Sequence, residues 1–97
     1  MSRPTKLDQG IHAWVAQHEG WARDDEMSGV SRTFDLGDFP GAIAFTMKLA
    51  LLAEKHNHHP DIDIRFKTVK VGWTTHDAGG LTRLDLALAE ATDLLAK

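Results

Sequence analysis

Apolar residues recur at helical spacing in three segments of the chain. The segment after Asp38 has the clearest pattern, because a residue able to cap a helix precedes an apolar stripe at i, i+4, i+7 and i+8. A first helix is predicted after Thr5, with Asp8 as the partner in its cap. A last helix is predicted after Thr82, where Asp85 falls at the third position and suits the positive helix end. The stripes comprise Leu7, Ile11, Trp14, Val15 and His18 in the first helix, Ile43, Met47, Ala50 and Leu51 in the second, and Leu84, Leu88, Ala91 and Leu95 in the last.

Between these helices the period of the pattern changes to two. The segment from Trp21 onward predicts a short hairpin with its turn at Ser28-Gly29. After Pro60, two alternating runs predict a second hairpin with its turn at Lys67-Thr68. Each run is apolar on one face only, as in an antiparallel sheet that helices cover on one side. The alternating apolar positions are Ile62, Ile64 and Phe66 in one run, and Val69, Val71 and Trp73 in the other.

The predicted order is helix, two strands, helix, two strands, helix. This order predicts an α+β fold, with a four-stranded antiparallel sheet and three helices packed on one face. A chain of 97 residues is expected to form one domain, residues 1–97, because domains most often contain about 100–150 residues. A chain of this size buries a thin core, which favours self-association.

Composition narrows the class of protein. The net charge of −3 and the absence of a basic cluster argue against direct binding of nucleic acid. The chain has no cysteine, which excludes disulfides and cysteine zinc sites. The N-terminus lacks the apolar run of a signal peptide, and the apolar-rich segment 39–53 contains Lys48 and is too short to cross a bilayer. We therefore expect a cytoplasmic protein that neither enters a membrane nor binds nucleic acid directly.

Three of the six histidines lie in the stretch KHNHHP, just before the second predicted hairpin. With a turn at Lys67-Thr68, the pairing of the two strands places His59 opposite His76 on the polar side of the sheet. Because neighbouring residues in a strand point to opposite sides, His58 is expected to face away from this pair unless Pro60 bends the chain first. The spacing alone therefore predicts two histidines, distant in sequence, at one end of a hairpin.

From the residues alone, three interpretations of these histidines remain open. Histidines at this spacing can bind zinc, with His76 as a third ligand. Imidazoles also titrate near neutral pH and can donate and accept protons without a cofactor. The third interpretation is a solvated loop, in which Glu54 is an exposed helix residue and Asp85 is only a helix cap.

The stretches EKHNHHP, FKTVKVGWTTH and GLTRLD resemble the signature of the pterin-4a-carbinolamine dehydratases, also called 4a-hydroxytetrahydrobiopterin dehydratases. The family pattern has Glu, three residues, and His-His-Pro, then a hairpin that ends in Thr-His, then Gly-Leu-Ser/Thr and an Asp. The chain departs from it at Ile62, where an aromatic residue is usual, at Phe66, where tyrosine is usual, and at His56, where an apolar residue is common. The positions that correspond to the pattern are Glu54, His58, His59, Pro60, Phe66, Val69, Thr75, His76, Gly80, Leu81, Thr82 and Asp85.

The resemblance implies an enzyme that dehydrates a 4a-hydroxytetrahydropterin to the quinonoid dihydropterin, in the recycling of tetrahydrobiopterin-type cofactors. It implies histidine acid–base catalysis without a metal and without a cofactor, because the pterin is the substrate. His58 and His76 are expected to exchange the protons, and His59 to bind and orient the pterin. The implied catalytic residues are His58, His59 and His76, and the implied substrate-binding residues are Glu54, Pro60, Thr75 and Asp85.

The resemblance also implies partners besides the pterin. Family members form dimers or dimers of dimers, so a homodimer or homotetramer is expected. Some relatives serve as accessory proteins to a transcription factor. The alternative to the enzyme is therefore a non-enzymatic dimerisation or binding module that acts on a protein partner.

Overall fold

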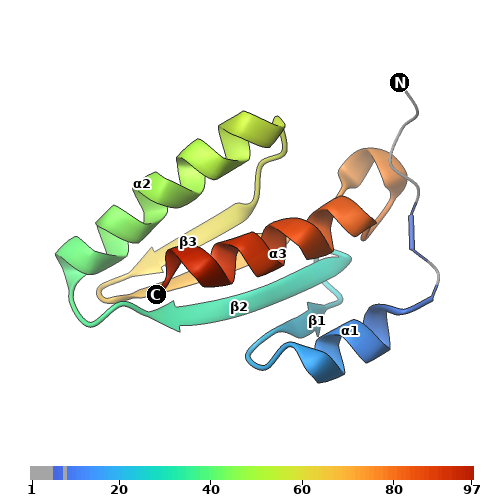
Figure 1. The fold of residues 1–97 in the computed structure, drawn as a ribbon, viewed down its shortest axis with the longest axis horizontal. Helices are drawn as coiled ribbons and strands as arrows, with labels where there is room; N and C mark the ends of the chain where they lie inside the picture. Colours follow the sequence, from blue (N-terminus) through green and yellow to red (C-terminus); the bar gives the residue numbers. More distant parts are fainter. Residues whose placement is uncertain (1–5, 8) are drawn as a thin grey trace.

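The computed structural model describes residues 6, 7 and 9–97, which form three α-helices and a four-stranded sheet. Figure 1 shows how these elements are arranged. The observed order α-β-β-α-β-β-α confirms the predicted α+β fold. No helix in this part of the chain has the length and hydropathy needed to span a membrane. The elements are α1 (Ile11–Gln17), β1 (Ala22–Asp24), β2 (Gly29–Asp35), α2 (Phe39–His56), β3 (Asp61–Arg65), β4 (Thr68–Trp73), a 3-10 turn η1 (His76–Ala78) and α3 (Arg83–Leu95).

All strand pairs of the sheet are antiparallel, and the strand order is β1-β2-β4-β3. The central strand β4 contacts both α2 and α3, which also contact each other on one face of the sheet (Figure 1). The alternating residues Val69, Val71 and Trp73 of β4 are fully buried under these helices. The predicted alternation therefore assigns the covered face of this strand correctly.

The observed N-caps agree with those predicted from the sequence at two of the three helices. Asp38 caps α2, and its carboxylate accepts a hydrogen bond of 2.7 Å from the Gly41 N–H. Thr82 and Asp85 form a capping box at the start of α3. The first helix differs from the prediction, because α1 begins at Ile11 and Gly10 occupies its N-cap. The predicted cap residues Thr5 and Asp8 lie outside the described residues.

The apolar stripe predicted to face the core from α2 lies on the exposed side of this helix instead. Ile43, Met47 and Leu51 are exposed on the surface, as is Ala50. A second set of apolar residues faces the sheet instead, because α2 is apolar on more than one side. The residues of α2 that the core buries are Ala42, Phe45, Leu49 and Ala53.

The turn of the second hairpin also differs from the prediction. Arg65 pairs with Thr68, so the turn residues are Phe66 and Lys67 and the register shifts by two residues. Phe66 adopts a left-handed backbone with φ of 52°, a conformation that two-residue hairpin turns require and that Gly and Asn favour. The same register, continued toward the start of β3, places His59 opposite Thr74 rather than His76. A shift of two residues leaves every side chain on its predicted face.

Candidate active site

The loop after α2 brings two histidines to the end of the sheet. Asn57 has a left-handed backbone with φ of 48° and ends the helix, while its N–H bonds back to the carbonyls of Ala53 and Glu54. The His58 N–H also bonds to the Ala53 carbonyl, at 3.1 Å. This tight C-cap places His58 and His59 immediately ahead of β3.

His58 is held from two directions. Its Nε2 lies 2.6 Å from Oδ1 of Asp85, and its ring stacks on Trp73 with a centroid distance of 5.7 Å and an interplanar angle of 8°. The His58 side chain is only 14% exposed. Its ring orientation is therefore defined by a hydrogen bond and an aromatic contact, and Nδ1 remains for a ligand.

The carboxylate of Asp85 has no exposed surface and collects several donors. The Thr75 hydroxyl donates to Oδ2 at 2.7 Å, and the Thr82 N–H donates to the same oxygen at 2.8 Å. Together with His58 on Oδ1, these donors offset the cost of burying a carboxylate. The residue that caps α3 is thus also the residue that positions His58.

His59 and Glu54 form a second, exposed pair. His59 Nε2 lies 2.6 Å from Glu54 Oε1, and the two side chains are 60% and 76% exposed. An exposed pair of this kind contributes about 0–1 kcal/mol to stability. Its geometry instead orients the His59 ring beside the same end of the sheet.

His76 lies at the same end of the sheet, in the loop that follows β4. Thr75 and Gly80 exchange backbone hydrogen bonds of 3.1 and 3.2 Å, which close the loop that carries the short turn η1. His76 is the first residue of η1 and is exposed. The bridge therefore holds an accessible imidazole next to Thr75, whose hydroxyl contacts Asp85.

All three predicted catalytic histidines line one hollow of about 230 Å³, together with Thr75. Three more residues line it that the sequence analysis did not single out: Asn57, Thr74 and Asp77. Thr74 could have been identified from the alternation, since it follows Trp73 and faces away from the helices. Glu54 and Asp85 do not line the hollow; they contact His59 and His58, which do. Pro60 is half-buried between His59 and β3 and is not among the lining residues.

The metal interpretation has little geometric support at this hollow. Within residues 6, 7 and 9–97, no three His, Cys, Asp or Glu side chains converge in an arrangement that could hold a metal ion. The Nε2 atoms of His58 and His59 each face a separate carboxylate, 2.6 Å away in both cases. These two Nε2 atoms are thus directed to separate partners, whereas zinc ligands converge on one point at about 2.0–2.1 Å.

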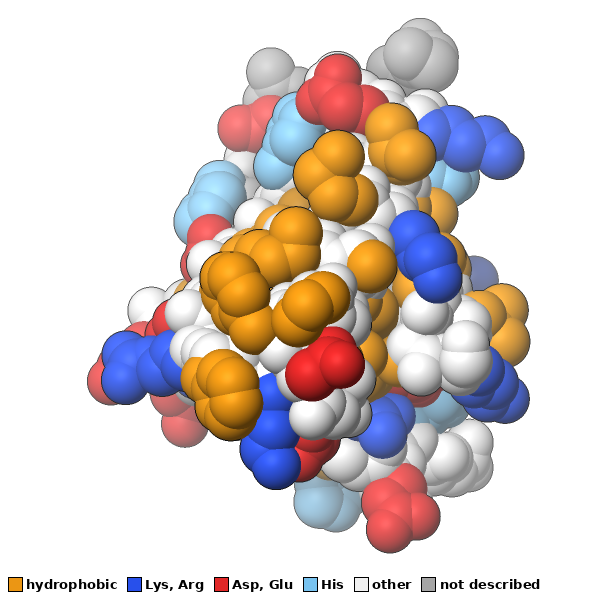
Figure 2. Space-filling model, turned by 90° about the vertical axis from the view of Figure 1, so that its left-hand side faces the viewer, with side chains coloured by type: hydrophobic (Ala, Val, Ile, Leu, Met, Phe, Trp, Pro, Cys, Tyr) orange, Lys and Arg blue, Asp and Glu red, His pale blue; other side chains and the backbone are white. Residues whose placement is uncertain are grey.

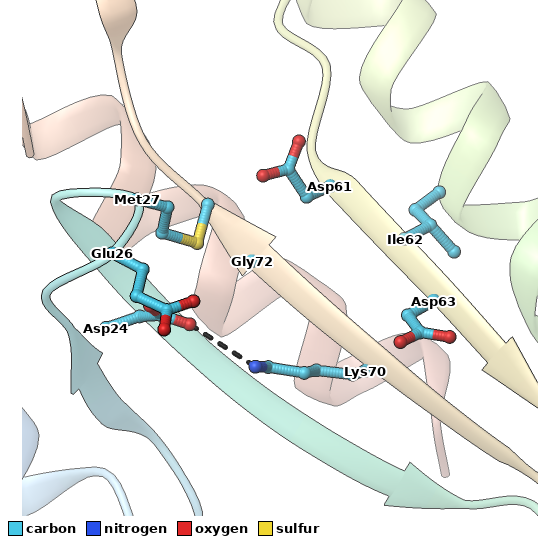
Figure 3. A pocket seen from close by; sticks show the side chains of 8 residues that line it. All are labelled: Asp24, Glu26, Met27, Asp61, Ile62, Asp63, Lys70 and Gly72. Atoms are coloured by element: carbon cyan, nitrogen blue, oxygen red, sulfur yellow. Dashed lines mark ion pairs between the residues drawn. The ribbon is translucent and has the colours of Figure 1, made fainter.

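A larger hollow of about 370 Å³ lies on the sheet face that the helices leave uncovered (Figure 3). Asp24 and Lys70 form an ion pair across it, with Oδ2 and Nζ 3.3 Å apart. Partial burial of the Asp24 carboxyl raises its pKa. Hydrogen bonding and charge from Lys70, and hydrogen bonds from Met27 and Ser31, lower the pKa by more than burial raises it, so the pKa of Asp24 lies below the ordinary value of 3.8.

The substitution Lys70→Met is expected to raise the pKa of Asp24 toward 3.8. A carboxyl group whose pKa is lowered in the folded state stabilises the fold at pH values above its ordinary pKa. This stabilisation is lost as the pH falls through the folded-state pKa. The Tm difference between the two proteins should therefore shrink on acidification. Carbon-detected NMR titration of the Asp24 carboxyl measures the shift directly, and equal pKa values in the two proteins would contradict the prediction.

Comparison with known proteins assigns the chain to a family. The family model described as pterin 4 alpha carbinolamine dehydratase matches residues 5–95, and the chain belongs to this family. A relative from Chloroflexus aurantiacus, named "Putative pterin-4-alpha-carbinolamine dehydratase", is 52% identical over 90 residues, which cover 93% of this chain and 95% of the relative. A similarly named protein of Rhodopseudomonas palustris is 43% identical over 89 residues, covering 92% of this chain and 88% of the relative.

Two solved structures share the fold. One is described as a transcriptional coactivator/pterin dehydratase from Brucella melitensis; it has a TM-score of 0.87 and 29% identity, over 96% of this chain and 99% of that one. The other is described as a pterin dehydratase-like protein identified as a RuBisCO assembly factor in the alpha-carboxysome; it has a TM-score of 0.68 and 25% identity, over 81% and 92% of the two chains. The fold therefore occurs in proteins whose descriptions include both a dehydratase and an assembly role.

Proposed function

We propose that this protein dehydrates a 4a-hydroxytetrahydropterin to the quinonoid dihydropterin by histidine acid–base catalysis without a metal or cofactor. The observation that carries the proposal is the hollow in which His58, His59 and His76 meet, with His58 oriented by the buried Asp85. Membership of the pterin dehydratase family supports the choice of substrate class. The reaction belongs to the recycling of tetrahydrobiopterin-type cofactors.

The reaction needs one proton donor and one proton acceptor. The hydroxyl on C4a is a poor leaving group until it is protonated, so one imidazole donates a proton as the C4a–O bond breaks. The lone pair of N5 then forms the C4a–N5 double bond, and a second imidazole accepts the N5 proton. The products are water and the quinonoid dihydropterin, and the protein ends with the same total number of protons.

We assign the proton transfers to His58 and His76, and the binding and orientation of the pterin to His59. His58 is the most strongly oriented of the three, since Asp85 fixes Nε2 and Trp73 fixes the plane of the ring. His59 contacts the exposed Glu54, which suits a residue that adjusts to a ligand. Glu54 and Asp85 then act through these histidines, while Thr75 contributes to the wall of the hollow.

The proposal is tested by a dehydratase assay with freshly generated 4a-hydroxytetrahydropterin, with and without a chelator. We expect multiple turnovers that the chelator leaves unchanged. Loss of activity on chelation would show that the reaction depends on a metal ion and would contradict the proposal. Folded protein that binds no pterin and accelerates no dehydration would remove the enzymatic proposal in favour of a binding module.

A second candidate function is association through an exposed apolar face. Figure 2 shows hydrophobic side chains gathered on the side of the molecule where α2 lies in Figure 1. β3 is an edge strand of the sheet, and Phe66 follows it in the hairpin turn. Exposed apolar patches beside an open edge mark association surfaces. The large exposed apolar residues of α2, β3 and this turn are Phe39, Ile43, Met47, Leu51, Ile62, Ile64 and Phe66.

We propose that this face joins copies of the chain into a homodimer or homotetramer, and that a protein partner is the alternative occupant. Leu51→Glu is expected to yield monomers, because a charge would be buried at the interface. Leu51 is 70% exposed in the single chain, and Leu94 of α3, at 67%, provides a matched control. Light scattering after gel filtration should give an oligomer for the parent and for Leu94→Glu, and a monomer for Leu51→Glu. A monomeric parent protein would favour the protein partner instead.

A further inference from the structure

Helix α3 carries a second buried polar side chain on the face that packs against the sheet. Thr92 has no exposed surface, as is also true of Asp85, seven residues earlier. Residues seven positions apart lie on the same face of a helix. Asp85 contacts His58 directly, whereas Thr92 has no role in the mechanism proposed above. Because burial of a hydroxyl is costly unless it is hydrogen-bonded, the partners of Thr92 indicate its role.

The partners of Thr92 are a backbone carbonyl and an indole. Its hydroxyl donates to the Leu88 carbonyl at 2.6 Å, and its oxygen accepts the Nε1–H of Trp73 at 3.1 Å. The first bond uses the hydroxyl proton and leaves lone pairs on the oxygen for the indole, whose nitrogen can only donate. Both polar groups are therefore paired inside the core, and their bond fixes the indole of Trp73 at its nitrogen.

The face of the same indole supports the His58 ring. The two rings are nearly parallel, with an interplanar angle of 8° and a centroid distance of 5.7 Å, as in offset-stacked aromatic pairs. Trp73 is fully buried, so the close-packed core leaves it no room to follow a rotating imidazole. Thr92, Trp73 and His58 therefore form one line of contacts, from the core to the histidine hollow.

The stack constrains a motion that the Asp85 hydrogen bond leaves open. An imidazole rotates about its Cβ–Cγ bond, and Nε2 lies closer to this axis than Nδ1 does. A hydrogen bond to Nε2 of His58 therefore restricts the rotation weakly, while the rotation displaces Nδ1 more than Nε2. Nδ1 is the nitrogen that remains for a ligand, so its direction depends on the stacked indole. Proton transfer requires the reacting atoms at hydrogen-bond distance, and small misplacements slow it.

We propose that Thr92 is a positioning residue, which acts through Trp73 to hold Nδ1 of His58 in the direction that proton transfer needs. Helix α3 then orients one imidazole from two sides: Asp85 acts at the ring edge, and Thr92 acts through Trp73 at the ring face. Thr92 itself contacts no ligand, since it is buried and does not line the hollow. The effect on rate rests on the proposed dehydration, whereas the contacts can be tested without a substrate.

Thr92→Val removes the hydroxyl and keeps the shape of the side chain. It should lower kcat about three- to tenfold, the range expected when an aromatic contact is lost, with little change in KM. Thr92→Ser keeps the hydroxyl and should retain most of the parent's kcat even where it lowers Tm. Thr46→Val is the matched control on α2, because the Thr46 hydroxyl also donates to a carbonyl four residues earlier, that of Ala42 at 2.8 Å. Equal losses of kcat in Thr92→Val and Thr46→Val would overturn the proposal.

Trp73→Phe separates this line of contacts from a general loss of packing. Phenylalanine can stack on His58 but has no N–H for Thr92. In this background Thr92→Val should therefore lower kcat no further, because the two substitutions remove the same interaction. A full additional loss of kcat in the double variant would contradict an effect that passes through the indole.

NMR of the His58 ring protons gives a readout that needs no turnover. The indole ring current shifts the protons of a stacked imidazole, so these shifts should move toward their unstacked values in Thr92→Val and stay in place in Thr46→Val. If the shifts change in this way but the parent does not dehydrate the pterin, the dehydratase is rejected and the positioning by Thr92 is retained. Turnover in the parent, with kcat and the His58 shifts both unchanged in Thr92→Val, would overturn the positioning alone.

Discussion

His58→Ala is expected to lower kcat for dehydration about 100- to 1,000-fold, in the range by which general acid–base groups accelerate reactions. The physical reason is the loss of an imidazole that Asp85 and Trp73 hold in one orientation at the hollow. His76→Ala should have an effect of similar size, because the reaction needs both a donor and an acceptor. Single-turnover rates of dehydration measure the chemical step in each variant.

The other histidines supply the contrast for this result. His59→Ala should mainly raise KM, since we assign His59 to binding and orientation. His56 is exposed in the last turn of α2 and does not line the hollow, so His56→Ala should keep the parent's rate. Full activity in His58→Ala, with a large loss in His59→Ala, would show that the roles assigned to His58 and His59 must be reversed.

Asp85→Ala is expected to destabilise the protein by about 3 kcal/mol, because a lost helix cap and buried donors left without an acceptor each cost about 1–2 kcal/mol. The donors left behind are the Thr82 N–H and the Thr75 hydroxyl, and His58 loses its partner. For a domain of this size, such a loss lowers Tm by more than about 10 °C. Urea unfolding followed by tryptophan fluorescence gives the free energy of unfolding.

Asp85→Asn separates the structural role from the positioning role. The amide keeps the side-chain volume and one carbonyl acceptor for the cap, so it should retain more stability than alanine does. The contact with His58 changes from a carboxylate to a neutral amide, which should alter the pH dependence of kcat. Glu54→Gln is the exposed counterpart and should change stability by less than about 1 kcal/mol. A pH profile of Asp85→Asn that matched the parent's would limit Asp85 to a structural role.

Local signals in the sequence were sufficient where the physical cause is local. Asp38 and the Thr82–Asp85 pair act within one helical turn, so their caps could be predicted from spacing. The alternation of β4 predicted its buried face, because side chains in a strand point to opposite sides in turn. The motif that carries His58, His59 and His76 likewise predicted the family, which the comparisons confirm.

The predictions that were wrong depended on contacts between distant parts of the chain. The α2 sequence offers apolar residues on more than one side, and only packing against β4 and α3 decides that Leu49 is buried while Leu51 is exposed. The residues around the second turn lack the Asn-Gly signal of a two-residue turn, so its position could not be read from them. Pairing with β4 places Phe66 in the turn and shifts the register by two residues.

The amino-acid sequence by itself determined the order of the elements, the histidine set and the family, because helical and strand periodicity and motif spacing are properties of the linear chain. The tertiary structure alone decided which carboxylate serves which histidine. Asp85 is 27 residues from His58 in the chain, yet its oxygen lies 2.6 Å from the ring because α3 packs against β4 beside the loop that follows α2. The same packing leaves the other face of the sheet open, where the hollow of about 370 Å³ lies.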